Sequence, residues 1–289
     1  MTEAEGVAGT VGVIGGGIMG AGIAQVTARS GCDVVLREVD AAMCESARRR
    51  IEGALDKAVR SGKLSEPDRD ATVGRLRYVT GFEEFAECDL VIEAVVEDEA
   101  VKADIFRALG KVTAGSGTVL ASNTSSIPIM RLAAVTEDPE RVIGMHFFNP
   151  VPVLPLVELI PSLLTSPETI ERARAFAGDR LGKQTVIGKD RAGFVVNALL
   201  IPYLLAAIRM VETGFATAED VDVAMVSGCA HPLGPLALAD LIGLDTTAAV
   251  ANSMYAEFKE PLYAPPPLLL RMVEGGRLGR KSGQGFYSY

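Results

Sequence analysis

The chain opens with a glycine-rich turn between a short apolar segment and a helical pattern, and this feature constrains the fold most. The segment Val11–Ile14 predicts a buried strand, and Gly15, Gly17 and Gly20 then form a G-x-G-x-x-G motif. The first glycine permits a tight turn, the second lets a pyrophosphate approach the backbone, and the third lets a helix pack closely on its strand. The phosphates would lie at the helix N-terminus, where the N–H groups and the helix dipole favour negative charge. The turn therefore predicts a dinucleotide-binding α/β domain.

An acidic residue follows the second predicted strand at the distance expected for a ribose ligand. The strand Asp33–Leu36 is followed by Arg37 and Glu38, and Glu38 lies 18 residues past Gly20. A carboxylate there accepts both ribose hydroxyls of an adenosine and repels a 2′-phosphate, so we expect NAD as the cofactor. Arg37 complicates this expectation, because its guanidinium could turn to meet a 2′-phosphate.

The composition excludes several classes of protein. The chain has 289 residues, 48% of them apolar, which suffices for one or two domains with a sizeable core. A net charge of −9 argues against nucleic-acid binding, and no apolar run is long enough to predict a membrane span. The short acidic start is unlike a signal peptide, and four scattered cysteines indicate free thiols in a reducing cytoplasm. With two histidines and no cysteine cluster, we expect no zinc site.

Two polar helices interrupt the alternation of strands and helices after Glu38. The pattern predicts one helix over about Ala41–Ser61 and a second that is capped by Ser65 and runs to about Leu76. Such a pair is expected to project from the sheet. Its tip carries Arg60 and Lys63, which form either a solvated surface or an anion-binding site.

The alternation then resumes and ends near Gly188. Asp89–Val96 reads as a buried strand, and the segment from Glu97 to Lys102 as the opening of a helix with acids in its first turn. Further strands are expected at residues 77–80, 118–122, 141–150, 156–160 and 184–187. Beyond Gly188–Arg191 the strand signals vanish, and apolar helical stretches follow at residues 194–211, 217–226, 235–258 and 266–274. An all-helical second domain is therefore expected after that boundary.

A histidine and a glutamate in apolar segments form the candidate catalytic pair. His146 is flanked by Met145 and Phe147, and Glu158 lies within Leu156–Ile160. The proline-rich stretch between them can reverse the chain and set the two strands side by side. A buried carboxylate is costly unless it is paired, and His146 is the obvious partner. A carboxylate on one ring nitrogen fixes the tautomer and leaves the other nitrogen to exchange a proton with a substrate hydroxyl. A core histidine with a structural partner is the alternative.

Two further polar residues are candidates for substrate contacts. Ser125 follows a predicted strand, at the end where open α/β sheets bind ligands. Asn197 lies in the apolar run Phe194–Leu200, where a buried amide needs partners. It either caps a backbone group or faces a cleft and binds a substrate carbonyl.

These segments resemble the short-chain L-3-hydroxyacyl-CoA dehydrogenase family, and in particular its bacterial 3-hydroxybutyryl-CoA dehydrogenases. The resemblance covers the chain in order, on the segments 122–126, 144–150, 156–158, 193–197, 231–235 and 279–287. It implies NAD-dependent, reversible oxidation of a short-chain (S)-3-hydroxyacyl-CoA to the 3-ketoacyl-CoA. It also implies a Rossmann-like domain with a helical hairpin over residues 1–188 and a smaller all-α substrate and dimerisation domain over 189–289.

The resemblance also assigns residue roles. His146 becomes the general base, Glu158 its orienting partner, and Ser125 and Asn197 the ligands of the reacting oxygen and acyl chain. The cofactor would be held by the glycine turn and by the charged and amide residues Glu38, Glu97, Lys102, Asn149 and Lys281. For Lys281 this implies that the C-terminal tail returns to the cleft of the first domain. Arg60 and Lys63 would contact the CoA nucleotide.

Several departures and rival functions bear on the substrate. Where the family often has Pro, Arg and Lys, this chain has Ala192, Ala198 and Pro155, which puts the acyl preference in doubt. Rivals are a dehydrogenase of carrier-protein thioesters and an inactive, crystallin-like relative. The 3-hydroxyisobutyrate and 6-phosphogluconate dehydrogenases share the glycine turn but need an interdomain lysine, and none lies between Lys189 and Lys259. His231, in a loop rich in Pro and Gly, is expected to be structural.

The apolar character of the second domain predicts an assembly. Runs such as Leu199–Ile208 and Pro235–Ala239 are too apolar for one small domain to bury alone. A twofold homodimer through the region after about residue 190 is expected, as in the family resembled.

Overall fold

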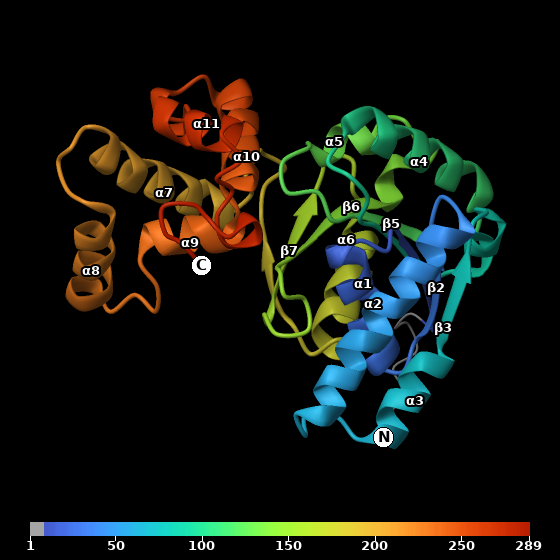
Figure 1. The fold of residues 1–289 in the computed structure, drawn as a ribbon. Helices are drawn as coiled ribbons and strands as arrows, with labels where there is room; N and C mark the ends of the chain where they lie inside the picture. The colour runs from blue at the N-terminus through green and yellow to red at the C-terminus, as the bar shows by residue number, and fades with distance from the viewer. Residues whose placement is uncertain (1–8) are drawn as a thin grey trace. The chain divides into compact units, whose positions relative to one another are not determined.

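The computed structural model describes residues 9–289, and their contacts divide the chain into two compact units. The first unit ends at Asp190 and the second spans Arg191–Tyr289. Figure 1 shows the course of the chain through both units.

The first unit is built on an eight-stranded sheet in the order β3-β2-β1-β4-β5-β6-β7-β8. All neighbouring strands are parallel except β6 and β7, which are antiparallel. The strands are β1 Thr10–Ile14, β2 Asp33–Arg37, β3 Leu76–Val79, β4 Leu90–Glu93, β5 Val119–Ser122, β6 Val142–Phe147, β7 Leu156–Pro161 and β8 Gln184–Ile187. The strand order reverses between β1 and β4, which is where doubly wound sheets bind their ligands. The predicted fold class, a Rossmann-like domain followed by a helical one, is confirmed.

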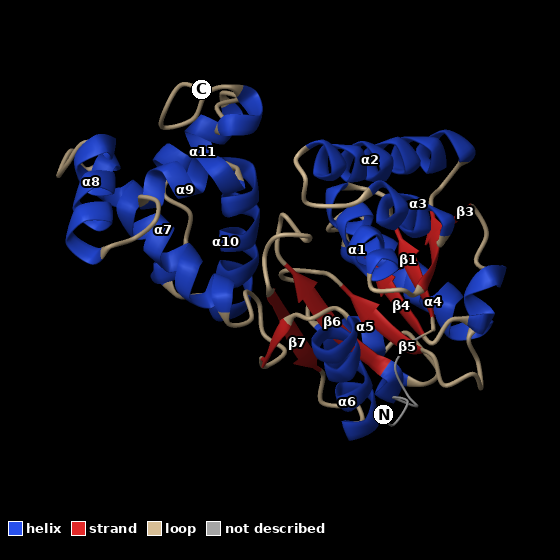
Figure 2. Ribbon diagram, turned by 90° about the horizontal axis from the view of Figure 1, so that it is seen from below, coloured by secondary structure: helices blue, strands red, loops and turns tan. Residues whose placement is uncertain are grey.

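Helices cover both faces of this sheet (Figure 2). They are α1 Ile18–Arg29, α2 Ala41–Arg60, α3 Glu66–Gly74, α4 Glu99–Val112, α5 Ile129–Ala133 and α6 Pro167–Ala175, with short turns η1 Glu83–Glu87, η2 Pro139–Arg141 and η3 Phe176–Arg180. Alternate strand residues such as Val11, Val13, Met145 and Phe147 join α1, α2 and α6 in one core cluster. Because successive side chains of a strand point to opposite faces, His146 is directed away from that core.

The two helices after β2 form the predicted hairpin. Ala47, Ile51 and Leu55 of α2 belong to the core, and residues beyond Leu55 are largely exposed. Ser65 caps α3 by accepting a hydrogen bond from the backbone N–H of Asp68, as the sequence predicts. The base of the hairpin is thus packed on the unit, and its tip is left in solvent.

The segment after β4 differs from the sequence prediction. The predicted strand continued to Val96, but β4 ends at Glu93, because Val95 N–H donates to Glu93 Oε1 rather than to a neighbouring strand. The next helix begins at Glu99, since Asp98 caps it by accepting from Val101 N–H. Glu97 therefore lies in the loop before the helix, not in its first turn, and is available to other partners.

The second unit is built mainly of helices, with two isolated β-bridges near its C-terminal end. Its elements are α7 Val196–Glu212, α8 Ala218–Cys229, α9 Pro235–Ile242, α10 Leu244–Phe258 and α11 Pro267–Glu274, with turns η4 Pro261–Tyr263 and η5 Arg280–Ser282. The stretch 235–258 is split at Gly243, whose φ of 104° ends α9. Among the residues that the structure describes, no helix is both long and apolar enough to cross a membrane.

Candidate functional site

Most of the first-unit residues predicted to be functional lie at the carboxyl ends of strands. The glycine turn follows β1, Glu38 follows β2, Glu97 follows β4 and Ser125 follows β5. His146 is the penultimate residue of β6, which is parallel to β5 and so ends at the same edge. One edge of the sheet therefore carries both the predicted cofactor residues and the predicted catalytic residues.

The glycine turn has the close packing that its sequence predicts. Gly15 has a φ of 95°, and a Cβ on Gly20 would lie 1.8 Å from the Gly15 carbonyl oxygen. Gly17 caps α1, and a Cβ there would have no described atom within 4 Å. Gly15 and Gly20 are thus required by the fold itself, whereas Gly17 leaves open space at the helix N-terminus. That space fits a pyrophosphate, which requires backbone N–H groups without a side chain in the way.

Glu38 is fixed against this turn. Its Oε1 accepts a 2.6 Å hydrogen bond from Gly16 N–H, and its Oε2 accepts one from Val39 N–H. The side chain is buried. Each carboxylate oxygen can accept more than one hydrogen bond, so both retain capacity for ribose hydroxyls. The geometry fits the adenosine half of NAD.

Glu97 holds the loop that carries Ser125. Its Oε1 accepts hydrogen bonds from Thr124 Oγ1, from the backbone N–H of Ser125 and from Ser126. Ser125 Oγ lies 3.4 Å from the same oxygen. Burial disfavours the ionised carboxylate, but the charge of Lys102 and these hydrogen bonds outweigh burial and lower the pKa of Glu97. Glu97 is therefore an anion that orders the Ser125 loop.

Lys102 is buried and paired inside the first unit. Its Nζ lies 2.6 Å from Oε1 of Glu93 and 3.4 Å from Oε2 of Glu97, and its side chain is 1% exposed. Ser122 Oγ donates to the other oxygen of Glu93. Sequence analysis missed Glu93, although a lone acid in an apolar strand is the same signal that identified Glu158.

His146 and Glu158 face each other across β6 and β7. The two residues are register partners in the antiparallel pair, and His146 Nδ1 lies 2.7 Å from Glu158 Oε2. Glu158 is fully buried and His146 is 7% exposed. The His146 ring also packs on Phe148, with 4.5 Å between ring centroids. The predicted chain reversal and pairing are thus present.

Two residues that sequence analysis did not single out support this pair. Asn123 Oδ1 accepts from Phe147 N–H and ties the Ser125 loop to the end of β6. Lys183 Nζ donates to the carbonyl oxygens of Val151 and Leu154, in the turn between β6 and β7. Burial lowers the pKa of Lys183. The donor and the acceptors lie about 30 residues apart in sequence, so no local pattern could have revealed this contact.

The remaining predicted residues are exposed or belong to the second unit. Asn149 is exposed just beyond β6, and Arg60 and Lys63 are exposed at the hairpin tip. Asn197 lies in the first turn of α7, and Lys281 pairs with Asp245, both within the second unit. The return of the C-terminal tail to the first domain stays a prediction. His231 Nδ1 lies 3.1 Å from Tyr203 Oη within the second unit.

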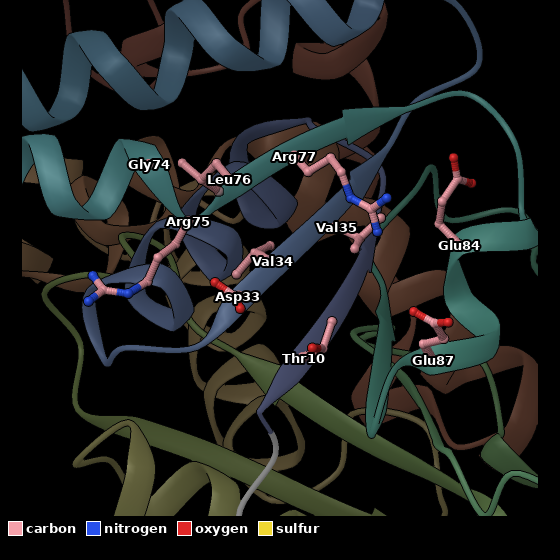
Figure 3. A pocket seen from close by; sticks show the side chains of 10 residues that line it. All are labelled: Thr10, Asp33, Val34, Val35, Gly74, Arg75, Leu76, Arg77, Glu84 and Glu87. Carbon is pink, nitrogen blue, oxygen red and sulfur yellow. The ribbon is translucent and has the colours of Figure 1, made fainter.

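A pocket of about 300 Å³ lies at the opposite edge of the sheet (Figure 3). Thr10, Asp33 and Leu76, the first residues of β1, β2 and β3, line it. β1 begins at this pocket and ends at the glycine turn, so the pocket is separate from the candidate site.

Models of a known family match almost the whole chain. Residues 10–191 match the NAD-binding domain of 3-hydroxyacyl-CoA dehydrogenase, and residues 193–289 match its C-terminal domain. The chain belongs to the 3-hydroxyacyl-CoA dehydrogenase family. It is therefore an oxidoreductase that uses NAD, as the sequence predicted.

Individual relatives agree with this family. A 3-hydroxybutyryl-CoA dehydrogenase of Mycobacterium tuberculosis is 58% identical over 279 residues, covering 96% of this chain and 98% of the relative. The crystal structure of M. tuberculosis FadB2 superposes with a TM-score of 0.97 at 57% identity, covering 98% of this chain and 99% of that one. The (S)-3-hydroxybutyryl-CoA dehydrogenase PaaH1 from Ralstonia eutropha gives a TM-score of 0.93 at 43% identity, with coverage of 98% and 99%.

Proposed function

We propose that this 3-hydroxyacyl-CoA dehydrogenase interconverts (S)-3-hydroxybutyryl-CoA and acetoacetyl-CoA with NAD. The observation that carries the proposal is the His146–Glu158 pair at the carboxyl edge of the sheet, beside the glycine turn of an NAD-binding domain. The names of the M. tuberculosis and R. eutropha relatives support the four-carbon substrate.

His146 acts as the general base. With its Nδ1 proton donated to Glu158, the ring is held in the tautomer whose Nε2 accepts a proton from the C3 hydroxyl. Glu158 stabilises the imidazolium that forms and is not itself the base. In the reverse direction the imidazolium returns the proton to the ketone oxygen. When bound, NAD supplies the acceptor for the hydride that leaves C3.

The remaining site residues bind and orient. Gly15, Gly17 and Gly20 shape the pyrophosphate turn, and Glu38 accepts the ribose hydroxyls. Ser125 and Asn197 hold the substrate oxygen and acyl chain. In the nicotinamide half we assign Asn149, Lys281 and the Glu97–Lys102 pair, the pair acting mainly through the Ser125 loop because Lys102 is buried. Arg60 and Lys63, both exposed cations, contact the CoA nucleotide.

One assay series tests the substrate. NADH oxidation is followed with acetoacetyl-CoA, with longer 3-ketoacyl-CoAs and with acetoacetyl thioesters of acyl carrier protein. We expect the highest kcat/KM with acetoacetyl-CoA. A higher kcat/KM with the carrier-protein thioester would identify the biosynthetic alternative, and no turnover with any of them would identify an inactive relative.

We also infer a cytoplasmic homodimer formed through the second unit, Arg191–Tyr289. Leu199, Phe215 and Val223 are 75%, 78% and 62% exposed there, and burying them against a second copy would be favourable. Light scattering at micromolar concentration should give twice the 30.4 kDa chain mass. A mass of one chain would contradict the dimer.

A further inference from the structure

Arg37 is the cation nearest in sequence to the proposed ribose ligand, and the fold brings it beside the glycine turn. It is the last residue of β2, and its carbonyl oxygen accepts a 2.9 Å hydrogen bond from Gly15 N–H. Arginine is the usual protein ligand of a phosphate monoester. An arginine at this position would be suited to the 2′-phosphate of NADP.

The structure holds the Arg37 guanidinium away from that role. Its Nε donates to the Thr80 carbonyl oxygen at 3.1 Å, and its Cζ lies 4.1 Å from the centroid of the Phe82 ring. Thr80 and Phe82 both follow β3, the edge strand that pairs with β2. We call this arrangement, in which Thr80 and Phe82 hold the Arg37 guanidinium, the clamp.

The clamp is anchored in the core of the first unit. Phe82 packs edge-on against Phe85, with 6.1 Å between ring centroids. Phe85 is fully buried, and a Cβ on Gly12 of β1 would lie 2.6 Å from its ring. Phe82 thus contacts Phe85, whose buried ring packs on Gly12 of β1.

We propose that Phe82 is a specificity-determining residue that favours NAD over NADP by clamping Arg37, without touching the cofactor. Glu38 repels a 2′-phosphate, and the clamp withholds the cation that could compensate. This inference rests on the proposed placement of Glu38 at the adenosine ribose. Its consequence is that neutralising Glu38 alone gives only part of the switch to NADP.

A set of variants separates the effect of the Glu38 charge from the effect of the Phe82–Arg37 contact. Glu38→Gln removes the repulsion, Phe82→Leu removes the aromatic face but keeps an apolar side chain, and Phe82→Tyr keeps the face as a matched control. The ratio of kcat/KM for NADPH to that for NADH is measured with acetoacetyl-CoA. Binding of 2′,5′-ADP and 5′-AMP is measured by competition with NADH, which gives a readout independent of turnover.

Glu38→Gln should raise the NADPH:NADH ratio on the order of 10- to 100-fold, as expected for the loss of a close like-charge pair. Adding Phe82→Leu should raise it by roughly three- to tenfold more, the range of one cation–π contact. Adding Phe82→Tyr instead should not raise it. Arg37→Gln in the Glu38→Gln/Phe82→Leu background should abolish the second increase, and 2′,5′-ADP affinity should follow the same order.

The clamp is refuted if Phe82→Leu leaves the ratio of the Glu38→Gln protein unchanged, or if the increase survives Arg37→Gln. An unaltered ratio in Glu38→Gln itself would overturn both the clamp and the placement of Glu38. Phe82→Leu alone should keep kcat/KM for NADH within about twofold of wild type, since Phe82 contacts Arg37 rather than the cofactor.

Discussion

Two buried glutamates at the same edge of the sheet pair with different kinds of base, one with a histidine and the other with a lysine. Glu158 on β7 faces the imidazole of His146, whereas Glu93 on β4 faces the amine of Lys102. Both glutamates are fully buried, and both stand alone in apolar strands. An imidazole with one nitrogen bonded to a carboxylate can exchange a proton with a substrate through its other nitrogen. The Glu93–Lys102 pair is instead buried inside the first unit, where it links neighbouring elements.

The other contacts of the Glu93–Lys102 and His146–Glu158 pairs are consistent with a structural role for the first and a catalytic role for the second. Glu93 accepts hydrogen bonds from Val95 N–H and Ser122 Oγ besides Lys102, so it joins β4 to β5. His146, by contrast, retains a small exposed surface at the edge of the sheet. We therefore expect changes at the His146 pair to reduce turnover and changes at the Lys102 pair to reduce stability.

The largest effect should follow from His146→Gln. Without a general base, kcat should fall on the order of 10²- to 10⁴-fold. NADH affinity and melting temperature, measured by fluorescence titration and thermal unfolding, should stay close to wild type. Wild-type turnover on acetoacetyl-CoA would mean that His146 is a core histidine.

Lys102→Met should instead destabilise the protein. Glu93 would be left as a buried charge without a counter-ion, which costs about 3–5 kcal/mol. Urea unfolding measures this loss. The double variant Glu93→Gln/Lys102→Met is the control and should recover much of it. A double variant no more stable than Lys102→Met would show that the two charges are not coupled.

Replacing each of the two glutamates by glutamine compares the two pairs most directly. Glu158→Gln should lower kcat by roughly 10- to 100-fold, because the imidazolium loses its counter-charge. Glu93→Gln should lower stability but leave kcat per folded molecule within about threefold of wild type. Equal losses of kcat in the two variants would remove the distinction between the pairs.

The smallest effect concerns the acid stability supplied by Glu97. Its pKa is lowered in the folded state, because the charge of Lys102 and the loop hydrogen bonds outweigh burial. Its ionised form therefore adds stability above the unfolded pKa, about 4.3 for a glutamate, and that stability is lost as pH falls through the lower folded value. The stability difference between wild type and Glu97→Gln should be constant near pH 7 and shrink below about pH 4. A difference that grows on acidification would contradict the lowered pKa.

Local patterns in the sequence were sufficient for much of the fold and part of the site. The G-x-G-x-x-G turn specifies a strand, a tight turn and a helix over a few residues, and the structure has all three. The prediction that Glu158 pairs with His146 succeeded because a short proline-rich reversal leaves the two strands little choice of register.

The sequence by itself determined the α/β class, the cofactor turn and the His146–Glu158 pair, because each depends on residues near one another in the chain. Tertiary structure decided that Glu93 pairs with Lys102, where β4 ends, and that Arg37 lies on Phe82. Arg37 and Phe82 are 45 residues apart in sequence and meet only because β2 pairs with β3. The physical reason is that a charged side chain has several possible partners in the sequence. Strand register and side-chain direction determine which of them it meets, and local sequence does not specify that register or direction.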